Sequence, residues 1–189
     1  MYNRLRDIEL WNASMEGDQQ AFGQLFRRYY SLLFQYGNKI CADTVVLEDC
    51  IQELFTELWH KRPGLVLQSV KAYLLQALKF KLYKSFRERK FSYDMNENSV
   101  FELSYESFLI DKEETLEKTT SIISAMNTLP ARQKEVIYLK IYKGLSYEEV
   151  SAIMDINYQV VRNLLCQALK ALRKLIHPLI FLGLSLLHS

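Results

Sequence analysis

Apolar residues recur every three or four positions through most of the chain, a pattern that predicts an all-helical protein. A short amphipathic stretch ends at Gly17, and Asp18 can cap the second helix. Asp43 or Thr44 can cap the third helix, and the fourth runs over residues 69–89. The chain contains only six Gly and three Pro, so few positions interrupt these helices.

The helical pattern breaks down after residue 90 and resumes near Leu116. We therefore expect an all-α fold of two small domains, at residues 1–90 and 118–175, joined by a flexible acidic linker at 91–117. Ser, Asn, Asp and Glu dominate this linker, with isolated aromatics at Phe101, Tyr105 and Phe108. An apolar tail follows at residues 176–189, and we expect it to pack onto the second domain.

The second domain contains the pattern of a helix-turn-helix. Ser146 and Glu149 form a capping box, a short helix follows, and Asn157 caps the last long helix. This arrangement presents the start of the last helix to the major groove of DNA. The exposed candidates for base or phosphate contacts are Tyr158, Gln159, Arg162, Asn163 and Gln167. The alternative is an ordinary helical hairpin with no role in DNA binding.

Charge is strongly segregated along the chain. Residues 71–90 hold seven Lys or Arg and one acid, whereas residues 91–117 hold eight acids and one Lys. The basic fourth helix suits single-stranded DNA, whose phosphates meet cations while its bases stack on rings. The candidates are Lys79, Phe80, Lys81, Lys84, Arg87 and Arg89. The alternative is a solvated lysine face over aromatic core residues, which we favour for Tyr73 and Tyr83.

The third helix carries an acidic face, formed by Glu48, Asp49, Gln52 and Glu53. An acidic face repels phosphates, so in a DNA-binding protein it favours a protein partner with a basic surface. A lone acidic face can also be no more than a solubilising surface.

Other classes of function find little support. The three cysteines form no CxxC pair and have no histidine cluster near them, so we expect no metal site, no disulfide framework and a cytoplasmic location. The first residues lack the layout of a secretory signal, and no apolar run reaches the roughly 18 residues of a membrane span. No nucleophile elbow, phosphate loop or carboxylate pair stands out, so we expect no catalytic residues, no cofactor and no enzyme activity.

Several segments together resemble one known family, the extracytoplasmic-function sigma factors of bacterial RNA polymerase. They are residues 17–30, Glu48–Phe55 with Trp59, Leu129–Val136 and Gly144–Val150. The resemblance implies that Asp49, Gln52 and Glu53 dock on the coiled-coil of the polymerase's largest subunit. It implies that the fourth helix and its preceding turn melt the minus-ten element and hold a flipped base, and that residues near Arg162 read the minus-thirty-five element. Phe80 and Lys84 depart from the family, which often has Asn and Asp there.

The resemblance further implies two partners, core RNA polymerase and promoter DNA in both duplex and single-stranded form. It also implies that the protein is released from an anti-sigma factor. Docking of that anti-sigma factor is the alternative role for the apolar tail. Two rival interpretations stand beside it. A homodimeric helix-turn-helix regulator would bind duplex DNA without polymerase, and a helical protein scaffold would bind no DNA.

Overall fold

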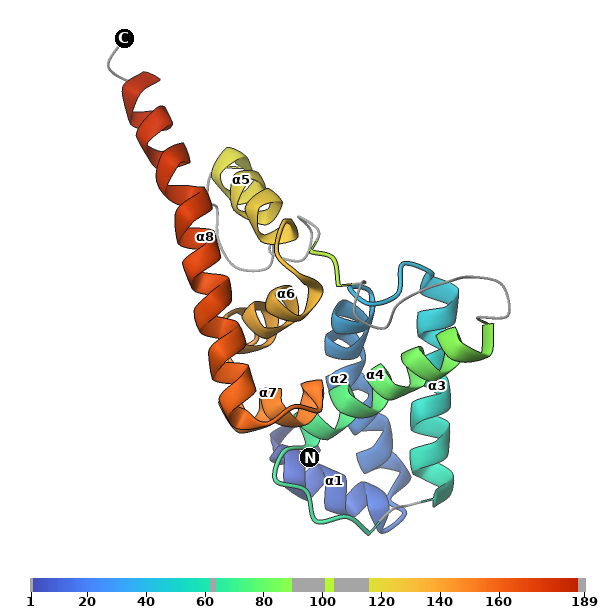
Figure 1. The fold of residues 1–189 in the computed structure, drawn as a ribbon. Coiled ribbons are helices and arrows are strands. Elements are labelled where there is room, and N and C mark those ends of the chain that lie inside the picture. The colour runs from blue at the N-terminus through green and yellow to red at the C-terminus, as the bar shows by residue number, and fades with distance from the viewer. Residues whose placement is uncertain (1, 62–63, 90–100, 104–115, 187–189) are drawn as a thin grey trace. The chain divides into compact units, whose positions relative to one another are not determined.

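A computed structural model describes residues 2–61, 64–89, 101–103 and 116–186 (Figure 1). All regular elements among these residues are helices, which confirms the predicted all-α class. The chain divides into two compact units, one formed mainly by Met1–Glu97 and the other mainly by Asn98–Ser151 and Ile156–Ser189.

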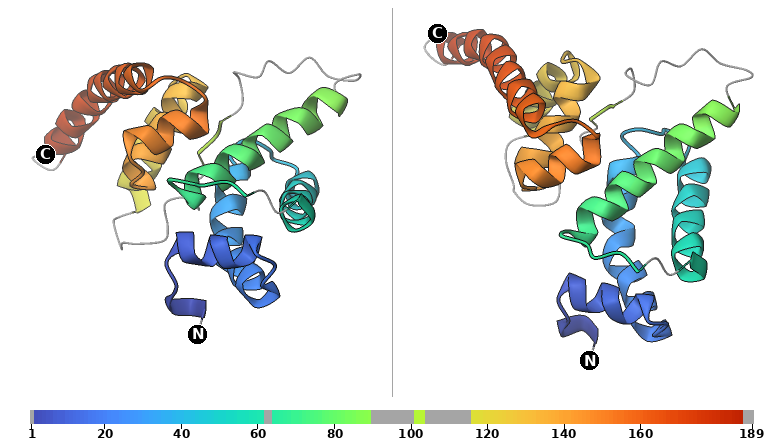
Figure 2. Two further views of the ribbon diagram at one scale, coloured as in Figure 1. Left: turned by 90° about the horizontal axis from the view of Figure 1, so that it is seen from below. Right: turned by 60° about the horizontal axis from the view of Figure 1, so that its bottom comes forward.

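The first unit consists of a short 3-10 helix and four α-helices. They are η1 (Tyr2–Arg4), α1 (Asp7–Met15), α2 (Gln19–Gly37), α3 (Thr44–Lys61) and α4 (Val70–Arg89). Helix α4 packs against both α2 and α3, as the views of Figure 2 show. The core between them is largely aliphatic, with Leu25, Leu33, Leu47, Leu74 and Leu78 all fully buried.

Capping residues fix where these helices begin, as the sequence predicts. Gly17 has φ 101°, the left-handed conformation that glycine adopts without strain. The Asp18 carboxylate accepts hydrogen bonds from the backbone N–H groups of Gln20 and Ala21 at 2.9 and 3.0 Å. Asp43, rather than Thr44, caps α3, because its Oδ1 accepts from the N–H of Val45 at 3.0 Å.

The second unit contains α5 (Leu116–Asn127), α6 (Ala131–Ile137), the π-helical turn η3 (Tyr138–Tyr142), α7 (Tyr147–Met154) and α8 (Tyr158–Leu186). Helices α5 and α6 pack against α8. The face of α8 turned to them buries Val161, Leu165, Ala168 and Leu172. Residues 131–142 form an α-helix followed by a π turn, a wider ladder that sequence periodicity does not reveal.

A segment within the predicted linker belongs to the core of the second unit. Phe101 and Leu103 are only 2 and 3 % exposed. The Asn127 side chain accepts from the Leu103 N–H at 3.1 Å and donates to the Leu103 carbonyl at 2.8 Å. The Phe101 ring lies 5.7 Å from that of Tyr138. The expectation of a flexible linker therefore does not hold at residues 101–103, because two apolar side chains and one amide fix them. The rest of the predicted linker up to residue 115 lies outside the described residues.

The apolar tail continues α8 as a helix as far as Leu186. Its side chains from residue 176 onward lie outside the described residues, so its expected packing onto the second domain stays a prediction.

A pair of glycine substitutions in α2 tests the close packing of the first unit. A Cβ on Gly37 would collide with the fully buried Leu47 side chain and lie 3.3 Å from Leu78 Cδ2. We expect Gly37→Ala to lower the free energy of unfolding by about 1–3 kcal/mol through overpacking. Urea denaturation followed by tryptophan fluorescence measures this unit alone, because both tryptophans, Trp11 and Trp59, lie in it.

Gly23→Ala is the matched control in the same helix. A Cβ there meets only the Arg27 guanidinium, at 3.9 and 4.0 Å. We expect it to stabilise the unit by up to about 1 kcal/mol, since alanine favours helix over glycine. Equal effects of the two substitutions would contradict the packing argument.

Candidate nucleic-acid interfaces

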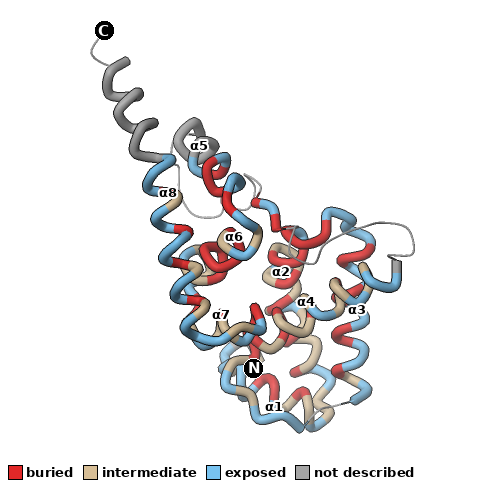
Figure 3. The backbone as a smooth tube through the Cα atoms, in the orientation of Figure 1, coloured by how far each residue is buried: buried red, intermediate tan, exposed pale blue. Residues whose placement is uncertain are grey.

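Helix α3 alternates buried and exposed positions, and this alternation sets its acidic face (Figure 3). Its apolar stripe includes Phe55, whose ring lies 4.9 Å from Phe26 and 5.9 Å from Phe22 on α2. With that stripe buried, the four predicted partner-binding residues all face solvent. They are Glu48, Asp49, Gln52 and Glu53. The structure thus brings this predicted set together on one surface.

Helix α4 presents a mixed surface of one ring and several cations. Phe80 is 52 % exposed, although it is a large apolar side chain. Lys84 and Arg87 are exposed, and Lys84 lies 3.7 Å from Glu88. Lys79 is half-buried, with its ammonium 5.8 Å from the centre of the Tyr83 ring. The Arg89 side chain lies outside the described residues.

Two rings of α4 for which we favoured a core role are half-buried. Tyr73 packs edge-on against the buried Trp11, with ring centroids 5.3 Å apart. The Tyr83 ring lies 6.4 Å from that of Phe86. The aromatic residues of α4 are thus not equivalent, and Phe80 is the one with the most open ring.

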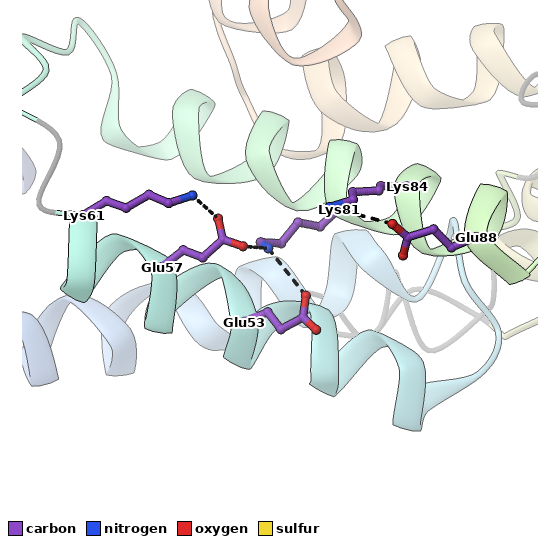
Figure 4. A network of polar contacts seen from close by, with 6 residues as sticks. All are labelled: Glu53, Glu57, Lys61, Lys81, Lys84 and Glu88. Atoms are coloured by element: carbon purple, nitrogen blue, oxygen red, sulfur yellow. Dashed lines mark hydrogen bonds and ion pairs between the residues drawn. The ribbon is translucent and has the colours of Figure 1, made fainter.

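Lys81 forms ion pairs with another helix, whereas Lys84 pairs with Glu88 one turn further along α4 itself. The Lys81 side chain is 16 % exposed, and its Nζ lies 2.6 Å from Glu57 Oε1 and 3.5 Å from Glu53 Oε2 of α3 (Figure 4). Lys61 holds the other oxygen of Glu57 at 3.1 Å. Hydrogen bonds from Lys81 and then Lys61 keep the pKa of the Glu57 carboxyl below its usual range. Lys81 therefore joins the predicted acidic face to the predicted DNA-binding helix.

A shallow hollow of about 530 Å³ lies beside this network. Its lining residues are Glu57, Phe80, Lys81, Lys84, Arg87 and Glu88. An exposed ring can stack on a base while the neighbouring cations contact phosphates, and binding of single-stranded DNA requires both contacts. Four of the six predicted minus-ten residues thus gather around one depression.

The turn before α4 carries two exposed apolar residues that the sequence analysis did not single out. Val66 is fully exposed and Leu65 is 45 % exposed. They stand between the Pro63-Gly64 stop and Ser69, whose hydroxyl caps α4 by accepting from the Ala72 N–H at 3.1 Å. An apolar pair inside a predicted turn was the available signal, because turns ordinarily favour polar residues.

Local hydrogen bonds build the helix-turn-helix as the sequence predicts. Ser146 and Glu149 complete the capping box, with Ser146 Oγ accepting from the Glu149 N–H at 3.1 Å and the Ser146 N–H donating to Glu149 Oε2 at 2.8 Å. Asp155 adopts φ 52° in the turn. Asn157 Oδ1 accepts from the Val160 N–H at 2.9 Å and so caps α8.

The five predicted minus-thirty-five residues are all exposed over the first three turns of α8. They are Tyr158, Gln159, Arg162, Asn163 and Gln167. Gln159 donates to Asn163 at 3.2 Å, and the Arg162 guanidinium lies 5.9 Å from the centre of the Tyr158 ring. Three side chains that can bond base edges, those of Gln159, Arg162 and Asn163, therefore contact neighbours on the same helix.

The described part of the chain contains no metal-ligand cluster and no helix that could span a membrane. No group of three or more His, Cys, Asp or Glu side chains there could hold a metal ion. None of the helices described is both long and apolar enough to cross a membrane.

A helical unit with an acidic helix beside a basic one, followed by a helix-turn-helix, is the architecture of a two-domain transcription factor. The family model for sigma-70 region 2 matches residues 25–91, and the model for sigma-70 region 4 matches residues 119–172. The chain thus belongs to the sigma-70 family, as an extracytoplasmic-function sigma factor.

Individual relatives agree. The chain is 21% identical over 175 residues to the ECF RNA polymerase sigma factor BldN of Streptomyces coelicolor, covering 90% of this chain and 66% of that protein. Two solved structures share its fold at 21% identity. CnrH, solved with the cytosolic domain of CnrY, matches with a TM-score of 0.61 over 91% of this chain and 97% of that one. The sigma factor RpoE, solved with the anti-sigma factor NepR from Bartonella quintana, matches with a TM-score of 0.59 over 84% and 98%.

The Lys81 network yields a prediction about the titration of Glu57. In Lys81→Met we expect the pKa of Glu57 to rise toward its ordinary value, because the largest cause of its lowering is removed. Carboxyl-detected NMR titration measures this pKa directly. A lowered pKa stabilises the fold above the ordinary value of 4.5, and this stabilisation is lost as the pH falls through the lowered pKa.

Lys61→Met is the control, since the Lys61 side chain is 72% exposed and is the smaller cause. We expect a smaller rise in the pKa of Glu57. An unchanged pKa in Lys81→Met would mean that the Lys81–Glu57 pair does not form in solution.

Proposed function

We propose that this protein is an alternative sigma factor that binds core RNA polymerase, directs it to specific promoters and initiates transcription there. The observation that carries the proposal is the presence, in one chain and in family order, of an exposed acidic face on α3, a basic and aromatic surface on α4 and a complete helix-turn-helix. Both family models fall on these segments.

Each surface has its own part in the proposed reaction. The acidic residues Glu48, Asp49, Gln52 and Glu53 form the polymerase-docking surface, because their charge complements a basic partner and avoids DNA. The α4 surface receives a single strand of the minus-ten element, with Phe80 stacking on a base and Lys84 and Arg87 contacting phosphates. Phe80 supports stacking but offers no group to bond a base edge. The start of α8 reads the minus-thirty-five element in the major groove.

The proposal covers location, chemistry and regulation. It places the protein in the cytoplasm, with no catalytic residue and no cofactor, since its task is to bind and to melt DNA. We propose an anti-sigma factor as a further partner. The solved relative RpoE was captured with the anti-sigma factor NepR, and CnrH with the cytosolic domain of CnrY.

The direct experiment combines the purified chain with core polymerase and measures binding, then run-off transcription on a genomic fragment library. Binding together with promoter-specific transcripts supports the proposal and gives the promoter sequence. A folded chain that ignores polymerase but binds a palindromic duplex as a dimer would contradict it in favour of a conventional regulator.

One substitution tests the docking surface. We expect Gln52→Ala to weaken binding to core polymerase at least about tenfold, as loss of a central interface residue does. It should change the free energy of unfolding by less than about 0.5 kcal/mol, because the side chain is exposed. Gln20→Ala, an identical change at an exposed position of α2, is the control and should bind as the natural chain does. Equal binding by both variants would remove Gln52 from the surface.

A second substitution tests promoter reading. We expect Arg162→Ala to reduce the preference for one base pair of the minus-thirty-five element by about 1–3 kcal/mol, the usual contribution of a bidentate contact. Fluorescence anisotropy of the polymerase complex on single-base variants of the promoter measures it. Lys170→Ala, at an exposed position two turns further along α8, should leave that preference intact. A uniform loss across all variants would mark Arg162 as a phosphate contact instead.

A further inference from the structure

A line of two rings between two cations joins the two helices of the helix-turn-helix. The Lys140 ammonium lies 4.5 Å from the centre of the Tyr147 ring. The Tyr147 and Tyr158 rings have centroids 5.4 Å apart at an angle of 58°. The Arg162 guanidinium lies 5.9 Å from the centre of the Tyr158 ring. We call these four residues the cation–ring line.

Hydrogen bonds to the backbone hold the Lys140 end of the line and the turn between α7 and α8. Lys140 donates to the Leu145 carbonyl at 2.8 Å, which fixes its ammonium in the turn before α7. Tyr147 is the first residue of α7, directly after the Ser146 cap. The turn between α7 and α8 is closed by the Ile156 N–H, which donates to the Ser151 carbonyl at 3.2 Å, and by Asn157 as the cap of α8. The separation of the two tyrosines is thereby set by hydrogen bonds.

The exposed end of the line is the residue that we assign to base reading. Arg162 and Tyr158 are exposed, whereas Tyr147 and Lys140 are half-buried. An arginine side chain has many rotamers, and a ring under its guanidinium reduces the number that it must give up on binding. A tyrosine that is itself held by a second ring provides a firmer support than one that rotates freely.

We infer that Tyr147 is a positioning residue for recognition of the minus-thirty-five element. It holds Tyr158, and through Tyr158 the Arg162 guanidinium, so base preference depends on a side chain of the supporting helix as well as on the recognition helix. This inference rests on the proposed function of Arg162. Lys140 completes the line by placing its ammonium 4.5 Å from the centre of the Tyr147 ring.

Protein alone provides the first test. The Arg162 guanidinium lies 5.9 Å from the centre of the Tyr158 ring, so the NMR shift of the Arg162 Hε proton in the natural chain reports this contact. We expect Tyr147→Leu to move this resonance toward that of a freely rotating arginine, and Tyr147→Phe, which keeps the ring, to leave it in place. Tyr142→Leu is the matched control. Tyr142 is also half-buried beside a lysine, with Lys143 4.9 Å from its ring centre, but it lies outside the line.

The second test uses the complex of the full chain with core polymerase and measures base preference on duplexes selected from a randomised minus-thirty-five element. We expect Tyr147→Leu to reduce the preference about two- to fivefold at the position that Arg162→Ala affects, a range set by the usual strength of cation–ring contacts. Combining it with Arg162→Ala should cost nothing further, because both changes remove one interaction. Tyr147→Phe and Tyr142→Leu should retain the natural preference.

The outcomes separate the inference from the function on which it rests. If Arg162→Ala leaves the base preference unchanged, the proposed role of Arg162 is overturned. If Arg162→Ala changes the base preference but Tyr147→Leu does not, only the inference about Tyr147 is overturned. A uniform loss of affinity in Tyr147→Phe would assign the hydroxyl to a phosphate and would also overturn it. If Tyr147→Leu does not fold, Tyr147→Met fills the space with a flexible chain and repeats both tests. Failure of both variants to fold makes Tyr147 a folding residue and ends the inference.

Discussion

Burial of one face of each helix is the constraint on which both candidate interfaces depend. A helix in water gains most of its stability from packing an apolar stripe, so the stripe decides which side chains remain outside. In α3 the stripe that includes Phe55 turns Asp49 and Gln52 to solvent. In α8 the stripe that includes Val161 and Leu165 turns Arg162 and Asn163 outward. The candidate functional surfaces are therefore the helix faces that packing leaves exposed.

This constraint explains why so much could be predicted from the sequence. The apolar stripe of a helix, its capping residue and the residue that ends it are local features, and each can be recognised within four or five residues of sequence. Asp18, Ser146 and Asn157 cap the helices that their positions predict, and the acidic face of α3 is exposed as a set. The family could be recognised for the same reason, since its two motifs fall on local elements.

What the sequence did not reveal depends on partners distant along the chain. The sequence does not distinguish Lys81 from the other lysines of α4. In the fold its Nζ lies 2.6 Å from Oε1 of Glu57, which is 24 residues earlier in the chain. Phe101 and Leu103 lie in an acidic, aperiodic segment, and only the amide of Asn127 and the ring of Tyr138 show that they belong to a core. The π turn at Tyr138–Tyr142 likewise has no signature in apolar spacing. Neither periodicity nor composition encodes such contacts.

The Lys81 network changes how the charge of the first unit should be understood. Counted along the sequence, α3 is acidic and α4 is basic, as though each served a separate partner. In the fold Glu53 and Glu57 pair with Lys81 of α4, so this lysine is less accessible to an outside partner than Lys84 and Arg87, which are exposed and lie nearer the end of that helix. Glu53 is 69% exposed and stands at the edge of both sets. A partner that engages Glu53 would weaken one of the two contacts that hold Lys81. Through that lysine the acidic face of α3 and the predicted DNA-binding helix α4 are electrostatically coupled.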